Sequence, residues 1–292
     1  MGRSIPLVEK EFVSGFRQQT EWAGLIASAF FFGKVGSGLF IMSVFLPSRL
    51  GMLVGLLIVL IGKGGAHFLY LGRPWRFWRG LARPQSAWIS RGIWAMGLMM
   101  VAGFALFVVP TSSALYMPLA VFAVICAFVV AVYDGFLLTS SPAIPIWNTA
   151  LMPVMCMFYS FLGGTTMVMF MAHLNLMTLS EKFMAILPGL EIGLLGANLL
   201  IVLLFLVGSI NTGSAGRESF DLLVKGPYAL PFFALAIGVG LVFTLLMSIF
   251  GSHASTGVVG LITVADLIGH FFIFFLLLKV GVFKPVLGFL KI

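Results

Sequence analysis

Apolar residues fill most of this chain in long blocks, and short polar stretches separate the blocks. A helix that crosses a bilayer needs about 20 consecutive apolar residues. The pattern predicts eight such helices, over residues 22–46, 51–70, 88–110, 115–137, 147–172, 185–208, 228–250 and 258–281. The expected fold is therefore that of an all-α integral membrane protein.

Composition supports this fold class. Hydrophobic residues make up 61% of the chain and charged residues only 9%, whereas about a quarter of the residues in a soluble domain are charged. So few charges could not cover a surface that faces water. We expect one transmembrane domain over residues 1–292, built as two four-helix bundles with halves at 20–140 and 145–282.

The basic residues concentrate on one side of the predicted bundle. An even number of spans places both termini on the same side, here called side A, and the opposite side B carries only Arg49 and Lys182. The side A residues are Arg3, Lys10, Arg17, Arg73, Arg76, Arg79, Arg83, Arg91, Arg217, Lys225, Lys279, Lys284 and Lys291. Because cytoplasmic loops are enriched in Lys and Arg, this distribution predicts that side A faces the cytoplasm. An alternative is that these residues bind an acidic partner on the outside.

The net charge of +8 does not indicate a nucleic-acid-binding protein. The charges are few and lie between apolar runs, which is typical of residues that contact lipid headgroups or an acidic partner protein. The bilayer is therefore one expected partner, and nucleic acid is not.

The connection at residues 71–87 is the most basic part of the chain. Arginines at 73, 76, 79 and 83, with Arg91 just beyond, have no acidic residue among them, and Pro74 and Pro84 interrupt any continuous helix. Trp75, Trp78, Trp88 and Trp94 lie around these arginines. Tryptophan and arginine at the end of an apolar run mark the headgroup layer. We expect this connection at the membrane surface, with His67 just inside the apolar layer.

Seven ionisable residues lie inside the apolar runs. A charge there costs at least about 2.5 kcal/mol by insertion scales, so such groups face the bundle interior and generally have a function. They are Lys34, Lys63, His67, Asp134, Glu191, Asp266 and His270.

Four polar residues are predicted to converge near side A. His67 and Tyr70 end one apolar run, and Tyr133 and Asp134 lie at the same depth on another. Together they could exchange protons beside an apolar cavity, because a neutral histidine offers both a donor and an acceptor. The alternative is structural: His67 caps a helix carbonyl and Asp134 pairs with a loop arginine.

Arranged by depth, the buried ionisable groups form a ladder from side A to side B. The predicted order is His67 with Asp134, then Lys63, then Lys34 with His270, then Asp266, then Glu191. One interpretation is a proton path. The other is a buried cluster of Lys, Asp and His that holds the bundle together, and sequence spacing alone favours neither.

The sequence offers no pattern for a metal centre or a haem. Cys126 and Cys156 each lie inside an apolar run, without the short spacing of iron–sulfur and zinc ligands. A haem held by two histidines needs them at matching depth on facing helices. Among the four histidines, His173 and His253 lie in turns near side B, and His67 and His270 differ in depth. We therefore expect neither group in this chain.

Four segments in order resemble the polysulfide reductase membrane-subunit family, which is also called NrfD-like. They are Leu71-Gly-Arg-Pro-Trp-Arg-Phe-Trp78, Ser86-Ala-Trp-Ile-Ser-Arg-Gly92, Tyr133-Asp-Gly-Phe-Leu-Leu138 and Pro145-Ile-Trp-Asn-Thr149. The resemblance is specific over about residues 20–170 and extends through the second half by hydropathy. One departure is Gln18-Gln-Thr-Glu-Trp22, where some relatives have a histidine and an asparagine.

This resemblance implies a subunit that binds quinone, either menaquinone or ubiquinone, and contains no haem. Such subunits exchange electrons with a docked four-cluster iron–sulfur protein, which serves a molybdopterin or other catalytic subunit. The location implied is the cytoplasmic membrane of a bacterium or archaeon. Several relatives place the partner face outside the cytoplasm, against the orientation that the charges predict here.

The resemblance also implies which residues bind the quinone, at the side A helix ends. On this resemblance His67, Arg73, Tyr133 and Asp134 match the site region, and we add Tyr70 and Trp88 to the expected binding residues. Among them, His67 and Asp134 are expected to exchange protons, and Tyr133 or Tyr70 to hydrogen-bond a ring oxygen. The proton path would continue through Lys63, Lys34, His270, Asp266 and Glu191.

A different class of function is a secondary transporter or proton channel that uses the ladder of buried Lys, Asp, Glu and His alone. Transporters frequently have helices that are broken at the membrane midplane. The prolines of this chain cluster at the predicted helix ends, which disfavours that function.

Overall fold

A computed structural model of the chain describes residues 15–251 and 255–284. Arg3, Lys10, His253 and Lys291, which the charge and haem arguments involve, lie outside the described residues. The predicted positions of these four side chains therefore stay expectations.

Eight helices in the described residues are long and apolar enough to cross a membrane, as predicted. Six are continuous: α1 (Gly24–Phe45), α4 (Trp88–Val108), α5 (Tyr116–Thr139), α6 (Leu151–His173), α7 (Glu181–Ile210) and α11 (Thr256–Lys279). The second span joins α2 (Arg49–Leu57), η1 (Ile58–Gly64) and α3 (Gly65–Tyr70). The seventh joins α9 (Ala229–Pro231), η3 (Phe232–Phe243) and α10 (Thr244–Phe250).

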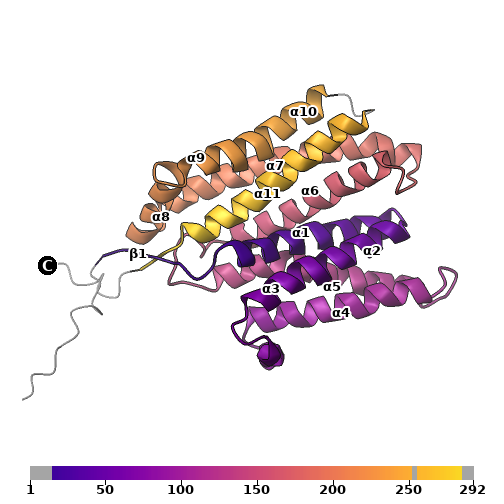
Figure 1. Cartoon of the computed structure of the whole chain (residues 1–292), viewed down its shortest axis with the longest axis horizontal. Coiled ribbons are helices and arrows are strands. Elements are labelled where there is room, and N and C mark those ends of the chain that lie inside the picture. Colours follow the sequence, from indigo (N-terminus) through magenta and orange to yellow (C-terminus); the bar gives the residue numbers. More distant parts are fainter. Residues whose placement is uncertain (1–14, 252–254, 285–292) are drawn as a thin grey trace, which may run out of the picture.

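The short elements lie at the side A end of the bundle (Figure 1). They are the strands β1 (Arg17–Gln18) and β2 (Val282–Phe283), the 3₁₀ helix η2 (Pro74–Leu81) and the helix α8 (Ser214–Val224). Pro74 is the first residue of η2, where its missing N–H is not needed, and Pro84 follows the end of η2. The prolines therefore act as predicted, since they separate η2 from the spans on either side.

The segment before α1 is fastened to the end of α11. Strand β1 pairs with β2 in antiparallel register, with Gln18 opposite Val282. Gln18 Nε2 donates to the carbonyl oxygen of Lys279 at 2.6 Å, and Gln19 Nε2 donates to that of Leu278 at 2.5 Å. These bonds satisfy carbonyls at a helix end that has no intrahelical donors.

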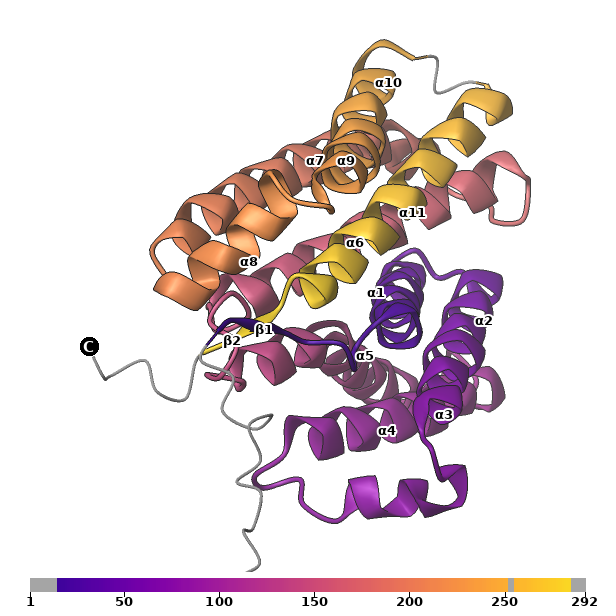
Figure 2. The same ribbon diagram turned by 60° about the vertical axis from the view of Figure 1, so that its left-hand side comes forward.

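Helix α1 lies in the interior, where it contacts α2, α5, α6 and α11 (Figure 2). Glycines allow the close approach: a Cβ on Gly36 would lie 2.8 Å from the backbone oxygen of Gly55, and one on Gly38 would overlap the backbone of Ser160. Small residues are the usual means of packing helices closely in lipid. Helix α1 adds residues to both of the large apolar clusters and so joins them. The division into two bundles stays a prediction.

Two π-helical segments, η1 and η3, interrupt spans that the apolar pattern predicts as uniform helices. A π segment changes which side chains face the neighbouring helices, and such segments are frequent at functional sites. In η1 the side chain of Lys63 is fully buried. The candidate site lies directly beside this segment.

Candidate functional site

A cavity of about 420 Å³ lies near side A, between α1, α3, η2, α4 and α5. Its volume falls within the range of about 300–1,000 Å³ that is typical of small-molecule sites. Most of its wall is apolar: Trp22, Ile26, Phe30, Phe68, Leu71, Phe77, Ile89, Ile93, Met96 and Leu137. Its polar side chains are His67, Tyr70, Arg76, Arg79 and Tyr133.

Part of the cavity wall belongs to the outer surface of the bundle. Phe68, Phe77 and Ile89 line the cavity and are 44%, 52% and 48% exposed. In a bilayer these apolar side chains face lipid or the headgroup layer. A lipid-soluble ligand therefore has an apolar surface along which it can reach the cavity.

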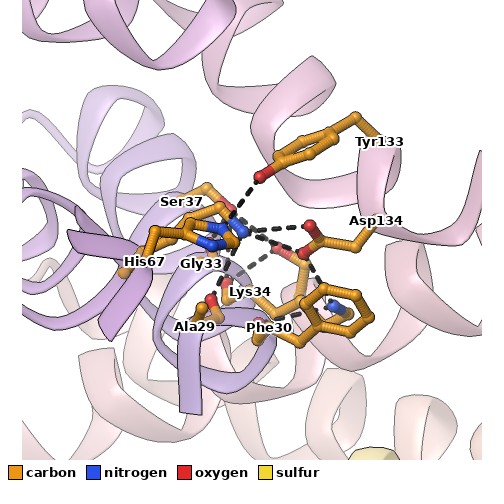
Figure 3. Close-up of polar contacts among 10 residues, drawn as sticks. Ala29, Phe30, Gly33, Lys34, Ser37, His67, Tyr133 and Asp134 are labelled. Atoms are coloured by element: carbon orange, nitrogen blue, oxygen red, sulfur yellow. Dashed lines mark hydrogen bonds and ion pairs between the residues drawn. The ribbon is translucent and has the colours of Figure 1, made fainter. Parts of the chain in front are cut away.

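His67 and Tyr133 form the central polar pair on the cavity wall. The Tyr133 hydroxyl oxygen and His67 Nε2 are 3.3 Å apart, and the hydroxyl points at the imidazole ring (Figure 3). Tyr133 comes from α5, and its ring packs against Gly92 of α4, where a Cβ would lie 2.5 Å from Cζ of the ring. The glycine of the Ser-Arg-Gly segment therefore makes room for the tyrosine of the Tyr-Asp-Gly segment.

Asp134 lies behind Tyr133 and does not line the cavity. Lys63 Nζ donates to its two carboxylate oxygens at 2.9 and 3.1 Å, and Lys34 Nζ donates to Oδ2 at 3.2 Å. All three side chains are fully buried. We call these three residues the Lys–Asp–Lys cluster. Asp134 therefore pairs with two lysines and not with a loop arginine.

Each lysine of the cluster has further partners. The ammonium nitrogens of Lys63 and Lys34 donate to the backbone oxygens of Ala29 and Phe30, both at 3.3 Å (Figure 3). Lys63 Nζ also lies 4.6 Å from the centre of the Tyr133 ring, a cation–π distance. Gly33 provides the space, since a Cβ there would lie 2.7 Å from Lys63 Nζ. One aromatic ring thus separates a buried ammonium from the cavity.

The predicted ladder divides into two groups. Lys34, Lys63 and Asp134 share one ion-paired cluster, whereas the sequence placed them at three successive depths. Glu191 lies apart, where Thr166 and Ser248 donate to it at 3.3 and 2.9 Å. Asp266 is also fully buried and lies one turn before His270 on α11.

His270 lies between these groups, with its ring centre 5.0 Å from that of Tyr159. The Phe274 ring packs beside His270 and lies 4.1 Å from Lys34 Nζ. Among the described residues, the oxygens of Asp266 and the ring nitrogens of His270 have no hydrogen-bond partner. None of Glu191, Asp266 and His270 lines the cavity.

Of the residues predicted to bind the ligand, His67, Tyr70 and Tyr133 line the cavity, and Arg73, Trp88 and Asp134 do not. Arg73 instead precedes the first residue of η2. Trp88 stacks on Phe136 at 4.5 Å and lies under Arg91.

Two arginines that the sequence interpretation missed, Arg76 and Arg79, belong to the cavity wall. Positions 73, 76 and 79 repeat every three residues, which is the period of a 3₁₀ helix. That period was the available signal, because within η2 it places Arg76 and Arg79 on one face, whereas Arg73 precedes the helix.

The segments at 18–22 and 145–149 contact each other beside the cavity. Trp22 lines the cavity and stacks on Trp147, with ring centres 5.4 Å apart. The Trp147 indole N–H donates to the carbonyl oxygen of Leu277 at 2.8 Å. These two tryptophans therefore connect the cavity wall to α11.

In the described part of the chain, no group of three or more His, Cys, Asp and Glu side chains could hold a metal ion. Cys126 and Cys156 are buried and free, as the apolar runs around them predict. His173 bonds the carbonyl oxygen of Met169 at 2.8 Å.

Comparison with known proteins agrees with the resemblance in the four segments. The chain is 35% identical to the C subunit of a sulfite dehydrogenase from Allochromatium vinosum over 81 residues, which is 26% of this chain and 25% of that relative. The family model for the polysulphide reductase NrfD proteins matches residues 13–285. With eight helices in its described residues that can span a membrane and a match over nearly its whole length, the chain belongs to the polysulphide reductase NrfD family of membrane subunits of oxidoreductase complexes.

Proposed function

We propose that this chain is the quinone-reactive subunit of its complex and that the cavity at side A binds the quinone ring. The observation that carries this proposal is the hydrogen-bonded pair of His67 and Tyr133 on the wall of an otherwise apolar cavity. The apolar wall suits a lipid-soluble molecule, and the polar pair suits its ring oxygens. A bound quinone supplies the two-electron chemistry that amino acid side chains lack.

In this proposal His67 and Tyr133 have different roles toward the quinone ring. The Tyr133 hydroxyl donates a hydrogen bond to one ring oxygen, and His67 accepts or returns the proton at Nε2. Tyr70 lines the same cavity and offers a second hydroxyl, while Arg76 and Arg79 orient the ring from η2. Asp134 acts through Lys63 as a positioning residue, because it has no surface in the cavity.

Protons exchange with side A in this proposal, because His67 lies in the last helical turns before η2. The longer path through Lys63, Lys34, His270, Asp266 and Glu191 is the competing proposal. The aromatic ring of Phe274 packs against both Lys34 and His270, and a phenyl ring can neither donate nor accept a proton. This contact favours the short route.

The partners follow from the family and from the surface of η2. We propose that a four-cluster iron–sulfur protein docks at side A, accepts the electrons and passes them to a molybdopterin or other catalytic subunit. Trp75 and Trp78 of η2 are exposed next to the row of arginines, which suits contact with an acidic protein. The proposed location is the cytoplasmic membrane of a bacterium or archaeon. Membership of the NrfD family does not favour a transporter.

The test replaces the proton-exchanging residue in the intact complex. His67→Ala should abolish quinol-linked turnover while the subunits still copurify. His173→Ala is the matched control, because His173 lies at the side B end of α6 and does not line the cavity. Full turnover in the His67 variant would remove this residue from the mechanism.

A further inference from the structure

The cavity lies beside a buried charge that is not balanced. In the Lys–Asp–Lys cluster two ammonium groups share one carboxylate, and none of the three side chains is exposed. With all three groups ionised, the cluster carries one net positive charge. Because the surroundings are apolar, such a charge acts over a longer distance than it would in water.

The other charges around the cavity have the same sign. Arg76 and Arg79 line the wall, and no aspartate or glutamate of the described residues lines it. Lys63 Nζ lies 4.6 Å from the centre of the Tyr133 ring, and this ring lines the cavity. The carboxylate of the cluster belongs to Asp134, which lies behind Tyr133 and has no surface in the cavity.

The titratable neighbours of the cluster do not cancel this charge. They come from every helix that packs around it: His67 of α3, Tyr133 of α5, Cys156 of α6 and His270 of α11. In their ordinary neutral forms these four groups add no charge. With the cluster ionised, the positive charges of Lys34, Lys63, Arg76 and Arg79 outnumber the one negative charge of Asp134 at and behind the cavity wall.

Building on the proposed function, we propose that the cavity selects ring ligands with an acidic ring hydroxyl and binds them as anions. The chemical class is that of the 2-hydroxy-1,4-naphthoquinones, preferred over neutral quinones of the same shape. Lys63 and Lys34 are the residues that determine this specificity. They act through their charge, since neither side chain touches the ligand space.

The first experiment uses the unmodified full chain in detergent. Two naphthoquinones with the same alkyl tail are compared, one with a hydroxyl and one with a methyl group at the same ring position. Binding is followed by quenching of tryptophan emission, because Trp22 lines the cavity. We expect the ionised hydroxy compound to bind about tenfold more tightly, which corresponds to about 1.4 kcal/mol.

The same titration supplies a readout that does not depend on affinity. Hydroxynaphthoquinones absorb differently as anions and as neutral molecules. Bound compound should therefore keep the absorption of the anion at pH values where free compound is already protonated. The methyl compound should bind equally well across the same pH range.

Three variants test the origin of the preference. Lys63→Met and Lys34→Met each remove one positive charge and should reduce the preference, while Arg76 and Arg79 still line the cavity and the methyl compound still binds. Asp134→Asn adds one net positive charge and should increase the preference, which damage to the fold would not do. Arg217→Gln is the control, since Arg217 is an exposed side A residue on α8 that does not line the cavity.

The outcomes separate this inference from the proposed function. If neither compound binds the unmodified chain, the proposed quinone site is wrong. If both bind with equal affinity at every pH, the charge selection is overturned and the quinone site stands. Should any variant fail to fold, the pH series with the unmodified chain still decides the question.

Discussion

Gly92 lies so close to Tyr133 that any side chain at position 92 would overlap the tyrosine ring, with a Cβ 2.5 Å from Cζ. Gly92→Ala should therefore displace the ring and break the 3.3 Å contact with His67. We expect binding of a quinone-like inhibitor to weaken roughly tenfold, or about 1.4 kcal/mol. The measurement is an inhibitor titration of the purified chain.

Gly97→Ala is the matched control for this variant. Gly97 lies on the same helix, and a Cβ there would meet no atom within 4 Å. Because alanine is a better helix former than glycine by about 1 kcal/mol, the control should be at least as stable as the parent. Equal inhibitor binding by the two alanine variants would show that the Tyr133 position does not matter for the site.

Asp134 pairs with two buried lysines, so replacing it should lower the stability of the fold. Asp134→Ala leaves both ammonium groups without their carboxylate partner, and breaking a buried ion pair in this way costs about 3–5 kcal/mol. The variant should unfold at a clearly lower temperature in detergent, as measured by circular dichroism.

A triple variant distinguishes the effect of unpaired charge on stability from the effect of altered packing in this cluster. Replacing Lys34, Lys63 and Asp134 together with apolar residues of similar volume should recover most of the lost stability, because apolar replacements of buried ion pairs are frequently neutral or stabilising. If the triple variant were no more stable than Asp134→Ala, packing and not unpaired charge would explain the loss.

The eight spans could be predicted because bilayer thickness sets a minimum length that each apolar run either meets or fails to meet. The meeting of His67 and Tyr133 was also predictable, since both lie near the side A ends of their runs, at the same depth. The pairing of Lys34 with Asp134 was not, because spacing along a chain does not determine which helices touch. Nor does the apolar pattern contain a signal for the π segment that holds Lys63.

The η2 arginines show a second reason why the sequence did not reveal every residue of the cavity wall. The family motif draws attention to Arg73, but a 3₁₀ helix repeats after three residues and turns Arg76 and Arg79 to the cavity, whereas Arg73 does not line it. Assigning site residues from a motif alone overlooked this geometry. The structure adds two arginines to the site and shows that Arg73 precedes them at the start of η2.

Arg76 and Arg79 should matter for ligand binding more than the other arginines of this connection. Arg76→Gln and Arg79→Gln each remove a charge from the cavity wall, so we expect inhibitor affinity to fall several-fold in the isolated chain. Arg83→Gln is the comparison, because Arg83 is exposed and does not line the cavity. A loss of the same size in all three would indicate a general surface effect.

Gly38 should tolerate no side chain, because a Cβ there would overlap the carbonyl group of Ser160 on α6. Overpacking of a tight interior typically costs about 1–3 kcal/mol, and here the opposing atoms are backbone. Gly38→Ala should lower the thermal unfolding temperature, whereas Gly65→Ala should not, since the space beside Gly65 is open. Unchanged stability of the Gly38 variant would mean that α1 and α6 can separate without cost.

The two proton routes predict different results for Asp266. If His67 exchanges protons directly with side A, Asp266 is not on the proton route, and Asp266→Asn should change quinol-linked turnover of the complex by no more than about twofold. Such a change corresponds to only about 0.4 kcal/mol in the activation barrier. The Asp266 side chain does not line the cavity, so the amide leaves the cavity wall unchanged. The measurement is turnover of the complex in sealed vesicles, with a pH indicator on each side. Loss of turnover with His67 intact would instead assign the protons to the longer path through α11.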